Sequence, residues 1–261
     1  MFAAYEALHA ALSGRFAGHQ ETSGGALAGA FVVADSLSGG ADALPLSGAI
    51  AGAGFLGMEE NAEAAREMLR HGRCDFVVNS LDEALRILKN ELRQKKPVSV
   101  VLAGSVEENL RQMAERGVAP DLVMHVRELE ECAPLRTMGG FGAVLMPAEQ
   151  INPWLERPAN AHGELARWTL PYGTTAMLGR LDSVVLTLLP PDDRMRRRWM
   201  EAAQRFLPRE VAPTRVFSLK HVEMERFLDA VSARIMSGEI VAPVEVEIGG
   251  NVMALGGEAA G

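Results

Sequence analysis

Short apolar runs alternate with longer polar segments over residues 27–147, and this alternation limits the possible folds more than any other feature of the sequence. The polar segments carry helix start and stop signals; NAEAAREMLRHG, for example, opens on Asn and ends on Gly. Strands that alternate with helices of this length form a parallel sheet with helices on its faces. The sequence therefore predicts an α/β fold with a doubly wound parallel sheet over 27–147. Ligands of such sheets bind beyond the carboxyl ends of the strands.

The expected strands of this region are apolar and end at turn residues. They lie in ALAGAFVVAD, GFLGME, CDFVVN, PVSVVLAG, APDLVMHV and, after a Gly-rich bend, LRTMGGFGAVLMP. The helix expected after the third run begins at Ser80, and Glu83 stands three residues later. This is the spacing of a capping box, in which each side chain accepts a hydrogen bond from the backbone N–H of the other residue.

The regular alternation ends near residues 135–150. Beyond it, DSVVLTLLPP and EIVAPVEVEIGG are expected strands, and residues 191–207 and 219–237 are expected helices. The sequence thus divides into three segments: a helix and loop at 1–26, the α/β domain at 27–147, and a C-terminal α+β extension at 148–261.

Composition excludes several classes of protein. The 261 residues carry a net charge of −8 with no dominant basic region, so nucleic acid is not an expected partner. The densest basic cluster, RMRRRW at 194–199, is expected to be a solvated helix face, with a phosphate or acidic-partner site as the alternative. Two cysteines indicate no disulfide framework, and no apolar run is long enough to span a membrane. The expected location is the cytoplasm.

The N-terminal segment is expected to be a helix with a wide apolar face. Residues 2–16 place Phe2 and Phe16 on that face, before the first strand begins. A terminal helix of this kind needs a surface to pack against. A homodimer is therefore predicted, and packing of the helix on its own domain is the alternative.

The turn after the first expected strand reads SLSGGADALP and has features of a phosphate site. Phosphate binds at a strand-to-helix turn through outward-pointing N–H groups, and glycine is needed because a Cβ would block close approach. Gly39 and Gly40 stand in this turn, although the complete G-x-G-x-x-G pattern is absent. Asp42 opposes phosphate binding, because its carboxylate would repel a pyrophosphate.

Glu59 ends the second expected strand, 20 residues after Gly39. In a dinucleotide-binding fold this position holds the acid that accepts hydrogen bonds from the ribose hydroxyls. A solvated carboxylate at a strand end is the alternative for Glu59. The two positions together make a nucleotide a candidate ligand.

A metal site has less support in the sequence than a nucleotide site. His71 and Cys74 are spaced like ligands on one helical turn, and Cys132 and His125 are the residues that would complete a set. The paired C-x-x-C spacing of a zinc site is absent, so no metal is predicted. His125 ends an expected strand on the ligand side of the sheet, and a hydrogen-bonded structural histidine is the interpretation favoured for it.

Five ordered stretches are similar to parts of one known family. They are YEAL, LAGAFVVADSLSGGADALPLSGAIAGAGFLGMEE, FVVNSLDEALRI, KPVSVVLAGSVEE and ERGVAPDLV. In this order and spacing they resemble the NAD-binding half of the urocanase (urocanate hydratase) family, over about residues 5–125. The resemblance implies a Rossmann-like fold with NAD as the cofactor. If the chain is an enzyme, the resemblance implies a hydratase-like lyase, in which NAD acts as an electrophile.

The resemblance also implies a set of cofactor-binding residues: Ser38, Gly39, Gly40, Glu59, Gly104 and Ser105. The sequence departs from the family pattern at Asp42, where the family has glycine, and at Ala64, where it has arginine. Ser105 replaces an asparagine, and VRELEE at 126–131 replaces the family's QTSAH. Residues 135–261 do not resemble the second urocanase domain, which supplies a catalytic cysteine. No catalytic residue is assigned, and hydration of urocanate is not expected.

Three functions are compatible with the sequence. The first is a divergent urocanase-like protein that still binds a nucleotide such as NAD, weakly because of Asp42. The second is a non-catalytic interaction or assembly module that has lost the cofactor, and the third is a lyase-like enzyme with an altered substrate. The side chain of Asp42 separates the first two. A carboxylate that caps the following helix would fill the phosphate site, and one turned to solvent would leave the site open.

Overall fold

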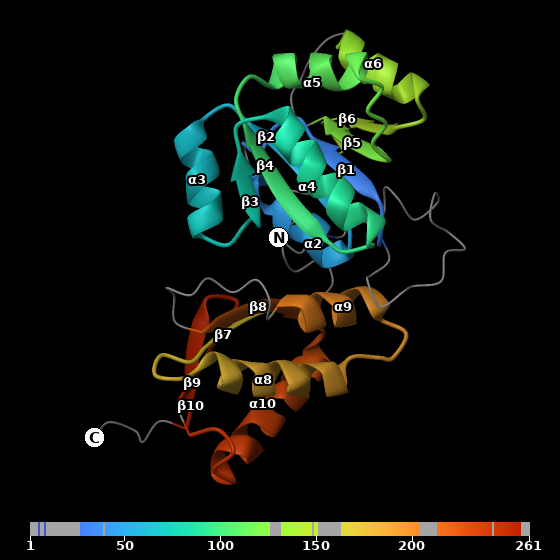
Figure 1. The fold of residues 1–261 in the computed structure, drawn as a ribbon. Helices are drawn as coiled ribbons and strands as arrows, with labels where there is room; N and C mark the ends of the chain where they lie inside the picture. Colours follow the sequence, from blue (N-terminus) through green and yellow to red (C-terminus); the bar gives the residue numbers. More distant parts are fainter. Residues whose placement is uncertain are drawn as a thin grey trace. The chain divides into compact units, whose positions relative to one another are not determined.

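The structure is a computed structural model. It describes Tyr5 and Leu8, and residues 27–38, 40–125, 132–147, 149–150, 163–203, 213–241 and 243–256. The chain divides into two compact units, Met1–Arg157 and Pro158–Gly261, and each is described by itself (Figure 1).

A parallel sheet forms the centre of the first unit. Its strands are β1 (Phe31–Ala34), β2 (Gly54–Glu59), β3 (Phe76–Val78), β4 (Val98–Ala103), β5 (Leu122–His125) and β6 (Val144–Pro147). In the described part of the unit they lie in the order β3-β4-β2-β1-β5-β6, and every neighbouring pair is parallel. The predicted parallel sheet is confirmed, with each strand inside or at the edge of its expected apolar run.

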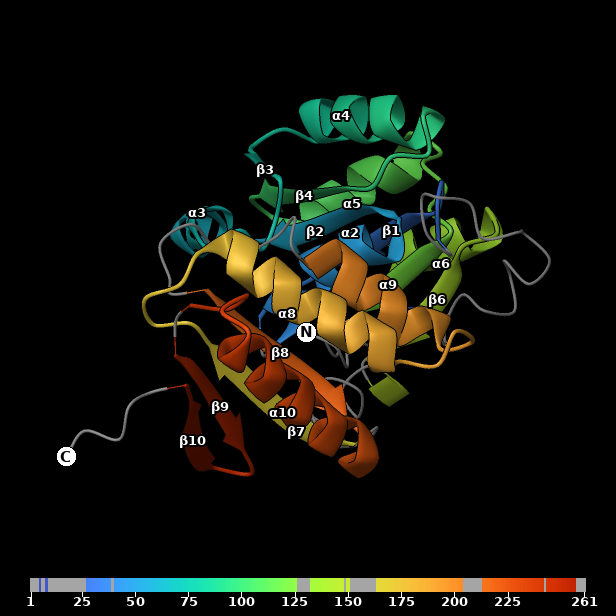
Figure 2. The same cartoon turned by 90° about the horizontal axis from the view of Figure 1, so that it is seen from below.

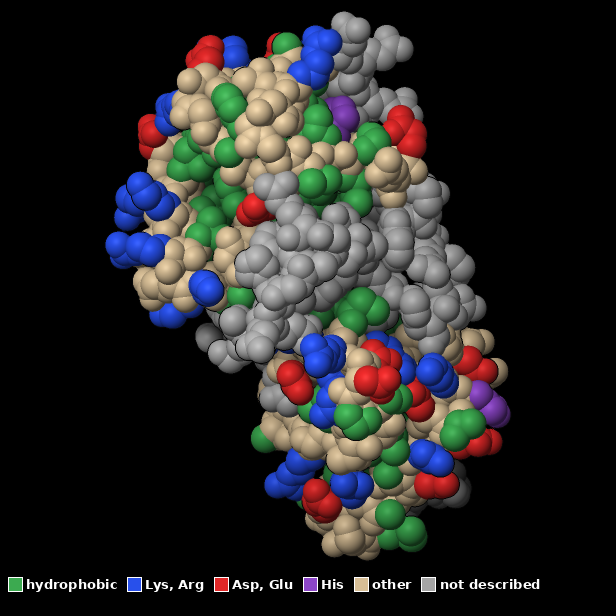
Figure 3. Space-filling model, turned by 90° about the vertical axis from the view of Figure 1, so that its right-hand side faces the viewer, with side chains coloured by type: hydrophobic (Ala, Val, Ile, Leu, Met, Phe, Trp, Pro, Cys, Tyr) green, Lys and Arg blue, Asp and Glu red, His purple; other side chains and the backbone are tan. Residues whose placement is uncertain are grey.

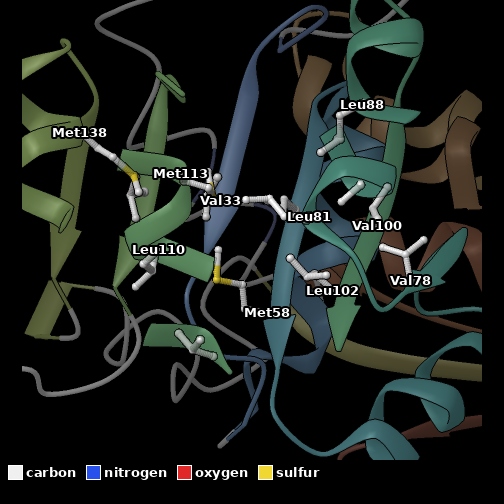
Figure 4. Close-up of a cluster of buried hydrophobic side chains, with 14 of the residues drawn as sticks. Val33, Met58, Val78, Leu81, Leu88, Val100, Leu102, Leu110, Met113 and Met138 are labelled. Atoms are coloured by element: carbon white, nitrogen blue, oxygen red, sulfur yellow. The ribbon is translucent and has the colours of Figure 1, made fainter. Parts of the chain in front are cut away.

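Helices cover both faces of this sheet. They are α2 (Leu44–Ala51), α3 (Ala62–Arg70), α4 (Leu81–Arg93), α5 (Val106–Glu115) and α6 (Ala133–Gly140), and a short 3₁₀ helix, η1 (Ala41–Ala43), precedes α2. Side chains from α4, α5 and α6 share one core with alternate residues of the strands, such as Val33, Val100 and Leu102 (Figure 4). Helix α2 packs against the other face, so the sheet is doubly wound as predicted.

Two glycines allow a close approach on the face of α2. A Cβ on Gly48 of α2 would lie 2.5 Å from the Phe55 ring of β2, and one on Gly57 of β2 would lie 2.7 Å from the side chain of Leu37. Both distances are too short for a real Cβ contact, so glycine is required for this packing. The contacts hold α2 and the turn before it against β2.

The helix caps agree with the sequence signals at two places and differ at a third. Asn61 accepts hydrogen bonds from the N–H groups of Glu63 and Ala64 at the start of α3, and Ser105 accepts from Glu108 N–H at the start of α5. Ser80 precedes α4 as predicted but makes no side-chain cap hydrogen bond, so the predicted capping box is wrong. Ser80 is exposed, and water can satisfy the first N–H groups of α4 instead.

The described part of the N-terminal segment is fully buried. Tyr5 and Leu8 are helical and have no exposed surface. This stretch therefore packs within its own chain, as in the alternative to a dimer, whereas Phe2 and Phe16 lie outside the described residues. The homodimer stays a prediction.

The second unit has a different architecture. Its elements are β7 (Glu164–Thr169), α8 (Thr175–Leu188), α9 (Arg194–Ala203), β8 (Thr214–Leu219), α10 (His221–Met236), β9 (Val244–Ile248) and β10 (Asn251–Leu255). The strands pair antiparallel in the order β10-β9-β7-β8, and α8 packs beside α10 (Figure 2). The α+β extension and the helices expected at 191–207 and 219–237 are confirmed. α9 begins at Arg194, three residues later than expected, residues 204–207 lie outside the described residues, and α10 is three residues shorter than expected.

The strand expected at DSVVLTLLPP is wrong, because this stretch forms the second half of α8. Thr174 caps the helix by accepting a hydrogen bond from Met177 N–H, and the buried residues recur at helical spacing: Leu178, Leu181, Asp182, Val184 and Val185. The strand expected in EIVAPVEVEIGG is present as β9, and residues 251–255, beyond the expected strand, form β10 and make a hairpin with it. Its two-residue turn is Gly249 and Gly250, both with positive φ (56° and 83°), which suits a tight β-turn between antiparallel strands.

Buried ion pairs join the helices of the second unit to one another and to its sheet. Arg196 of α9 is only 3% exposed and donates to both carboxylate oxygens of Glu223 on α10, at 2.7 and 2.9 Å. Arg215 of β8 donates to Asp182 of α8 at 2.9 Å. The solvated helix face predicted for 194–199 is therefore wrong at Arg196, because its guanidinium is buried and paired.

The surface of the second unit mixes charges of both signs. On the face in Figure 3, Lys and Arg side chains lie among Asp and Glu side chains over this unit.

Among the described residues, no helix is long and apolar enough to cross a membrane.

We predict that the Arg196–Glu223 pair makes the second unit sensitive to acid. Burial alone would raise the pKa of Glu223, but hydrogen bonds from Arg196 and the Lys220 N–H lower its pKa below the ordinary 4.5. A lowered folded-state pKa contributes stability that is present above the ordinary pKa and is lost as pH falls through the folded value. Glu223→Ala should lower the free energy of unfolding by about 3 kcal/mol, because it leaves a buried guanidinium short of a partner.

Urea unfolding at neutral pH and at pH steps below the ordinary pKa measures both effects. The matched control is Glu225→Ala, which removes an exposed carboxylate of the same helix and should change stability by less than about 0.5 kcal/mol. Equal destabilisation by the two variants would contradict the stabilising role of the Arg196–Glu223 pair.

Candidate active or binding site at the carboxyl ends of the strands

Four neighbouring strands end at one edge of the sheet in the first unit. In order these are β4, β2, β1 and β5. Hydrogen bonds continue the pairing past the strand ends, because Gly104 N–H donates to the Glu59 carbonyl (3.0 Å) and Asp35 N–H donates to the Met124 carbonyl (3.2 Å). Residues that follow these strands are therefore fixed beside one another.

The chain leaves β1 and β5 toward opposite faces of the sheet. After β1 it leads to α2, which packs on Phe55, whereas the next described helix after β5 is α6, whose Leu135 and Met138 belong to the core on the other face. This is the topological switch point of the sheet, where open α/β folds bind ligands.

The turn after β1 has the backbone shape expected of a phosphate site. Gly40 has a left-handed conformation (φ 89°, ψ −6°), and a Cβ there would meet nothing within 4 Å. The Ser36 and Ser38 hydroxyls are 2.8 Å apart, and Ser36 Oγ accepts a hydrogen bond from Ser38 N–H. Gly39 lies outside the described residues. A ligand can approach the backbone at Gly40 without a side chain in the way.

Asp42 neither caps a helix nor turns free to solvent. Its carboxylate forms an ion pair with Arg73, which lies just after α3. The residue before α2, Ala43, has no side-chain cap, so the start of this helix is not filled by a carboxylate. Arg73 thus supplies a cation beside Asp42, which Ala64 does not, and opposes the field of its carboxylate. The repulsion of phosphate by Asp42 stays a prediction.

Glu59 ends β2 beside this turn and is half-buried. Its Oε1 accepts a hydrogen bond from Asn61 N–H at 2.9 Å, which holds the side chain at the start of α3. Its second oxygen makes no hydrogen bond within the described part of the chain. One carboxylate oxygen is therefore positioned by the fold, and the other is available to a ligand.

The end of β4 is also open. Gly104 has φ 138°, and a Cβ there would meet nothing within 4 Å. Ser105 Oγ accepts from Glu108 N–H (3.3 Å), so its hydroxyl is engaged as a helix cap. The sheet thus brings Ser38, Gly40, Glu59, Gly104 and Ser105 to one edge.

A pair that the sequence analysis missed lies at the switch point. Asp35 is fully buried directly after β1, and its Oδ2 contacts Nδ1 of His125, the last residue of β5. His125 is hydrogen-bonded, as expected. The acid that follows the first apolar run was the available signal for its partner, but pairing with β5 could be known only from the strand order.

The cysteines do not form a reactive or metal-binding centre. Both are free, and burial together with the charge of Asp75 raises the pKa of Cys74 to about 12, so its thiol stays protonated at neutral pH. Within the described ranges, no group of three or more His, Cys, Asp or Glu side chains could hold a metal ion.

A comparison with protein families agrees with this geometry. Residues 8–131 match the family model described as the urocanase Rossmann-like domain. The match covers just under half of the 261 residues and includes β1 to β5 with all the strand ends above. The resemblance seen in the sequence is confirmed over this part of the chain, which has a nucleotide-binding type of fold.

Proposed function

Because residues 8–131 match the model of the urocanase Rossmann-like domain, we propose that the protein binds an adenine dinucleotide, with NAD as the first candidate. The observation that carries this proposal is the position of Glu59 at the end of β2, beside the open left-handed turn after β1. A carboxylate and a glycine turn on adjacent parallel strands are the two parts that a dinucleotide site requires.

In the proposed complex, the adenine-side ribose hydroxyls donate to Glu59. The pyrophosphate lies against the backbone of the turn that contains Ser38, Gly39 and Gly40. Gly104 leaves room for the ligand at the end of β4, since its Cα carries no side chain and the space beside it is open. Ser105 holds α5 through its cap, so it contributes through the position of its backbone.

We further propose that the protein does not hydrate urocanate. Urocanase requires a catalytic cysteine from a second domain, and the match to the family ends at residue 131. Cys74 is buried with a raised pKa, which does not suit a nucleophile. The second unit has an antiparallel sheet, and its described residues contain no cysteine.

The interaction-module hypothesis makes the opposite prediction about ligands. The Asp42–Arg73 pair argues against it, because a degraded phosphate site would not need a cation beside the introduced carboxylate. A chain that bound no adenine nucleotide at all would favour the module.

Loss of the Glu59 charge should weaken nucleotide binding. Glu59→Gln is expected to raise the dissociation constant of NAD about tenfold, because a charge-assisted hydrogen bond to a ribose hydroxyl is replaced by a neutral one. Isothermal titration calorimetry measures this change. Glu60→Gln is the matched control, since it removes the neighbouring exposed carboxylate and should leave the affinity unchanged.

Arg73 should affect NAD binding because its charge compensates the carboxylate of Asp42. In Arg73→Met the Asp42 carboxylate is uncompensated, and at about 5 Å from a phosphate charge with an effective dielectric near 20 the repulsion is about 3 kcal/mol. NAD binding should therefore weaken by about a hundredfold. The double variant Arg73→Met/Asp42→Asn should recover most of this loss in the same titration. Equal affinities of the single and double variants would show that the pair lies too far from the ligand.

Urocanate should remain unchanged in the presence of the protein and saturating NAD. The ultraviolet absorbance of urocanate follows this directly, with an active urocanase as the positive control. A steady decline of absorbance that depends on the concentration of this protein would overturn the second half of the proposal.

A further inference from the structure

The pair at the ends of β1 and β5 has no role in the nucleotide contacts proposed above. β1 and β5 lie side by side in the sheet (Figure 1). Asp35 and His125 are lateral neighbours, because the pairing of these strands continues through the Asp35 N–H. By strand alternation they lie on the same face as Val33 and Val123, which are buried in the core under α5 and α6. The fold therefore holds the two side chains together at the switch point of the sheet.

The hydrogen bond between them fixes what the ring can do. An ionised carboxylate only accepts hydrogen bonds, so the contact with Asp35 Oδ2 keeps a proton on His125 Nδ1. In a neutral ring the other nitrogen, Nε2, is then an acceptor. Asp35 is thus a positioning residue that sets both the orientation and the tautomer of the histidine.

The hydrogen bonding of His125 Nε2 indicates that a ligand binds there. His125 Nε2 is buried and has no hydrogen-bond partner among the residues that the structure describes. A histidine that only joined two strand ends would be expected to satisfy both nitrogens, because a buried acceptor without a donor costs free energy. A donor from a bound molecule removes that cost.

The acceptor role of Nε2 selects the kind of group that can pair with it. An ionised phosphate or carboxylate has no proton to donate, so neither forms a hydrogen bond with an acceptor nitrogen. A carboxylate behind a histidine also orients metal ligands, but no described set of three ligands includes this residue. A neutral O–H or N–H group is the donor that fits.

The place of His125 in the sheet indicates which part of a ligand reaches it. Glu59 and His125 end the strands on either side of β1, and neighbouring strands lie about 4.8 Å apart. A dinucleotide with its adenine ribose at Glu59 and its pyrophosphate over the turn after β1 extends its second nucleoside toward β5.

We infer that the Asp35–His125 pair binds the second nucleoside of the dinucleotide, with Nε2 accepting a hydrogen bond from a neutral ribose hydroxyl or carboxamide N–H. The inference rests on the proposed function, since it needs a dinucleotide at the strand ends. It adds a residue on the β5 side, at a position that the sequence analysis assigned to structure.

Nuclear magnetic resonance of the full chain, labelled with ¹⁵N histidine, tests the inference. Titrations with AMP, ADP-ribose and NAD use ligands that contain one nucleoside, a second ribose, and a second ribose with a carboxamide. AMP should leave the His125 Nε2 resonance unchanged, and NAD should shift it. A shift with ADP-ribose identifies the ribose hydroxyl as the donor, and a shift with NAD alone identifies the carboxamide.

The variant His125→Gln supplies an affinity readout, because its amide can still donate to Asp35. It should raise the dissociation constant of NAD about fivefold, as expected for one neutral hydrogen bond, and leave that of AMP unchanged. His221→Gln, an exposed histidine of the second unit, is the control.

Failure of this inference and failure of the proposed function give different results in the titrations. If AMP binds but NAD leaves the His125 resonances of the wild type unmoved, or if AMP and NAD shift them equally, the inference about the pair is wrong and nucleotide binding stands. If none of the three ligands binds, the proposed function and this inference both fail. The titration uses the wild-type protein, so the test does not depend on how well the variant folds.

Discussion

The pairing of β1 with β2 on one side and β5 on the other is the constraint on which the first unit depends. β1 has only four residues, yet it sits at the centre of the parallel sheet and is hydrogen-bonded on both edges. Because neighbouring strands run the same way, their carboxyl ends meet at one edge. Because the chain leaves β1 and β5 toward opposite faces, that edge opens between them. The turn, Glu59 and the Asp35–His125 pair owe their proximity to this arrangement.

The turn after β1 combines altered residues with a preserved shape. Glycines at 48 and 57 let α2 and Leu37 approach β2 closely, which fixes where the turn lies. Asp42 introduces a charge that is foreign to a phosphate site, but Arg73 pairs with it. Asp42 lies in the turn before α2, and Arg73 lies just after α3. The backbone at Gly40 has its left-handed conformation, and a Cβ there would meet nothing within 4 Å. The turn thus keeps its backbone shape although its sequence departs from the family pattern.

Sequence patterns predicted the elements whose signal is local. The inner strands β1, β2, β4 and β5 are continuous apolar runs because both of their faces are buried, and the helices of this unit carry recognisable ends. The strand predicted at DSVVLTLLPP was wrong, because its β-branched residues are typical of strands. In the structure these residues belong to α8, which begins with the cap at Thr174 and buries side chains at helical spacing. The hairpin turn at Gly249 and Gly250 was visible in the sequence but was taken as the end of a single strand.

The candidate site was predictable only in part. Gly40, Glu59 and Gly104 follow strands, so their place at one edge follows from a parallel sheet. The partners of Asp42, Arg196 and His125 come from distant parts of the chain, and no spacing in the sequence reveals them. Long-range charge pairing is decided by strand order and helix packing, which is why Arg196 was expected on a solvated face and is buried instead.

The central claim is that an adenine dinucleotide binds across the carboxyl ends of β2, β1 and β5. A crystal structure of the protein grown with NAD at millimolar concentration tests it most directly. The account predicts the adenine ribose on Glu59, the pyrophosphate against the turn at 36–40 and the second nucleoside toward His125. NAD bound elsewhere on the protein, or absent from this edge at a concentration that saturates binding in solution, would contradict it.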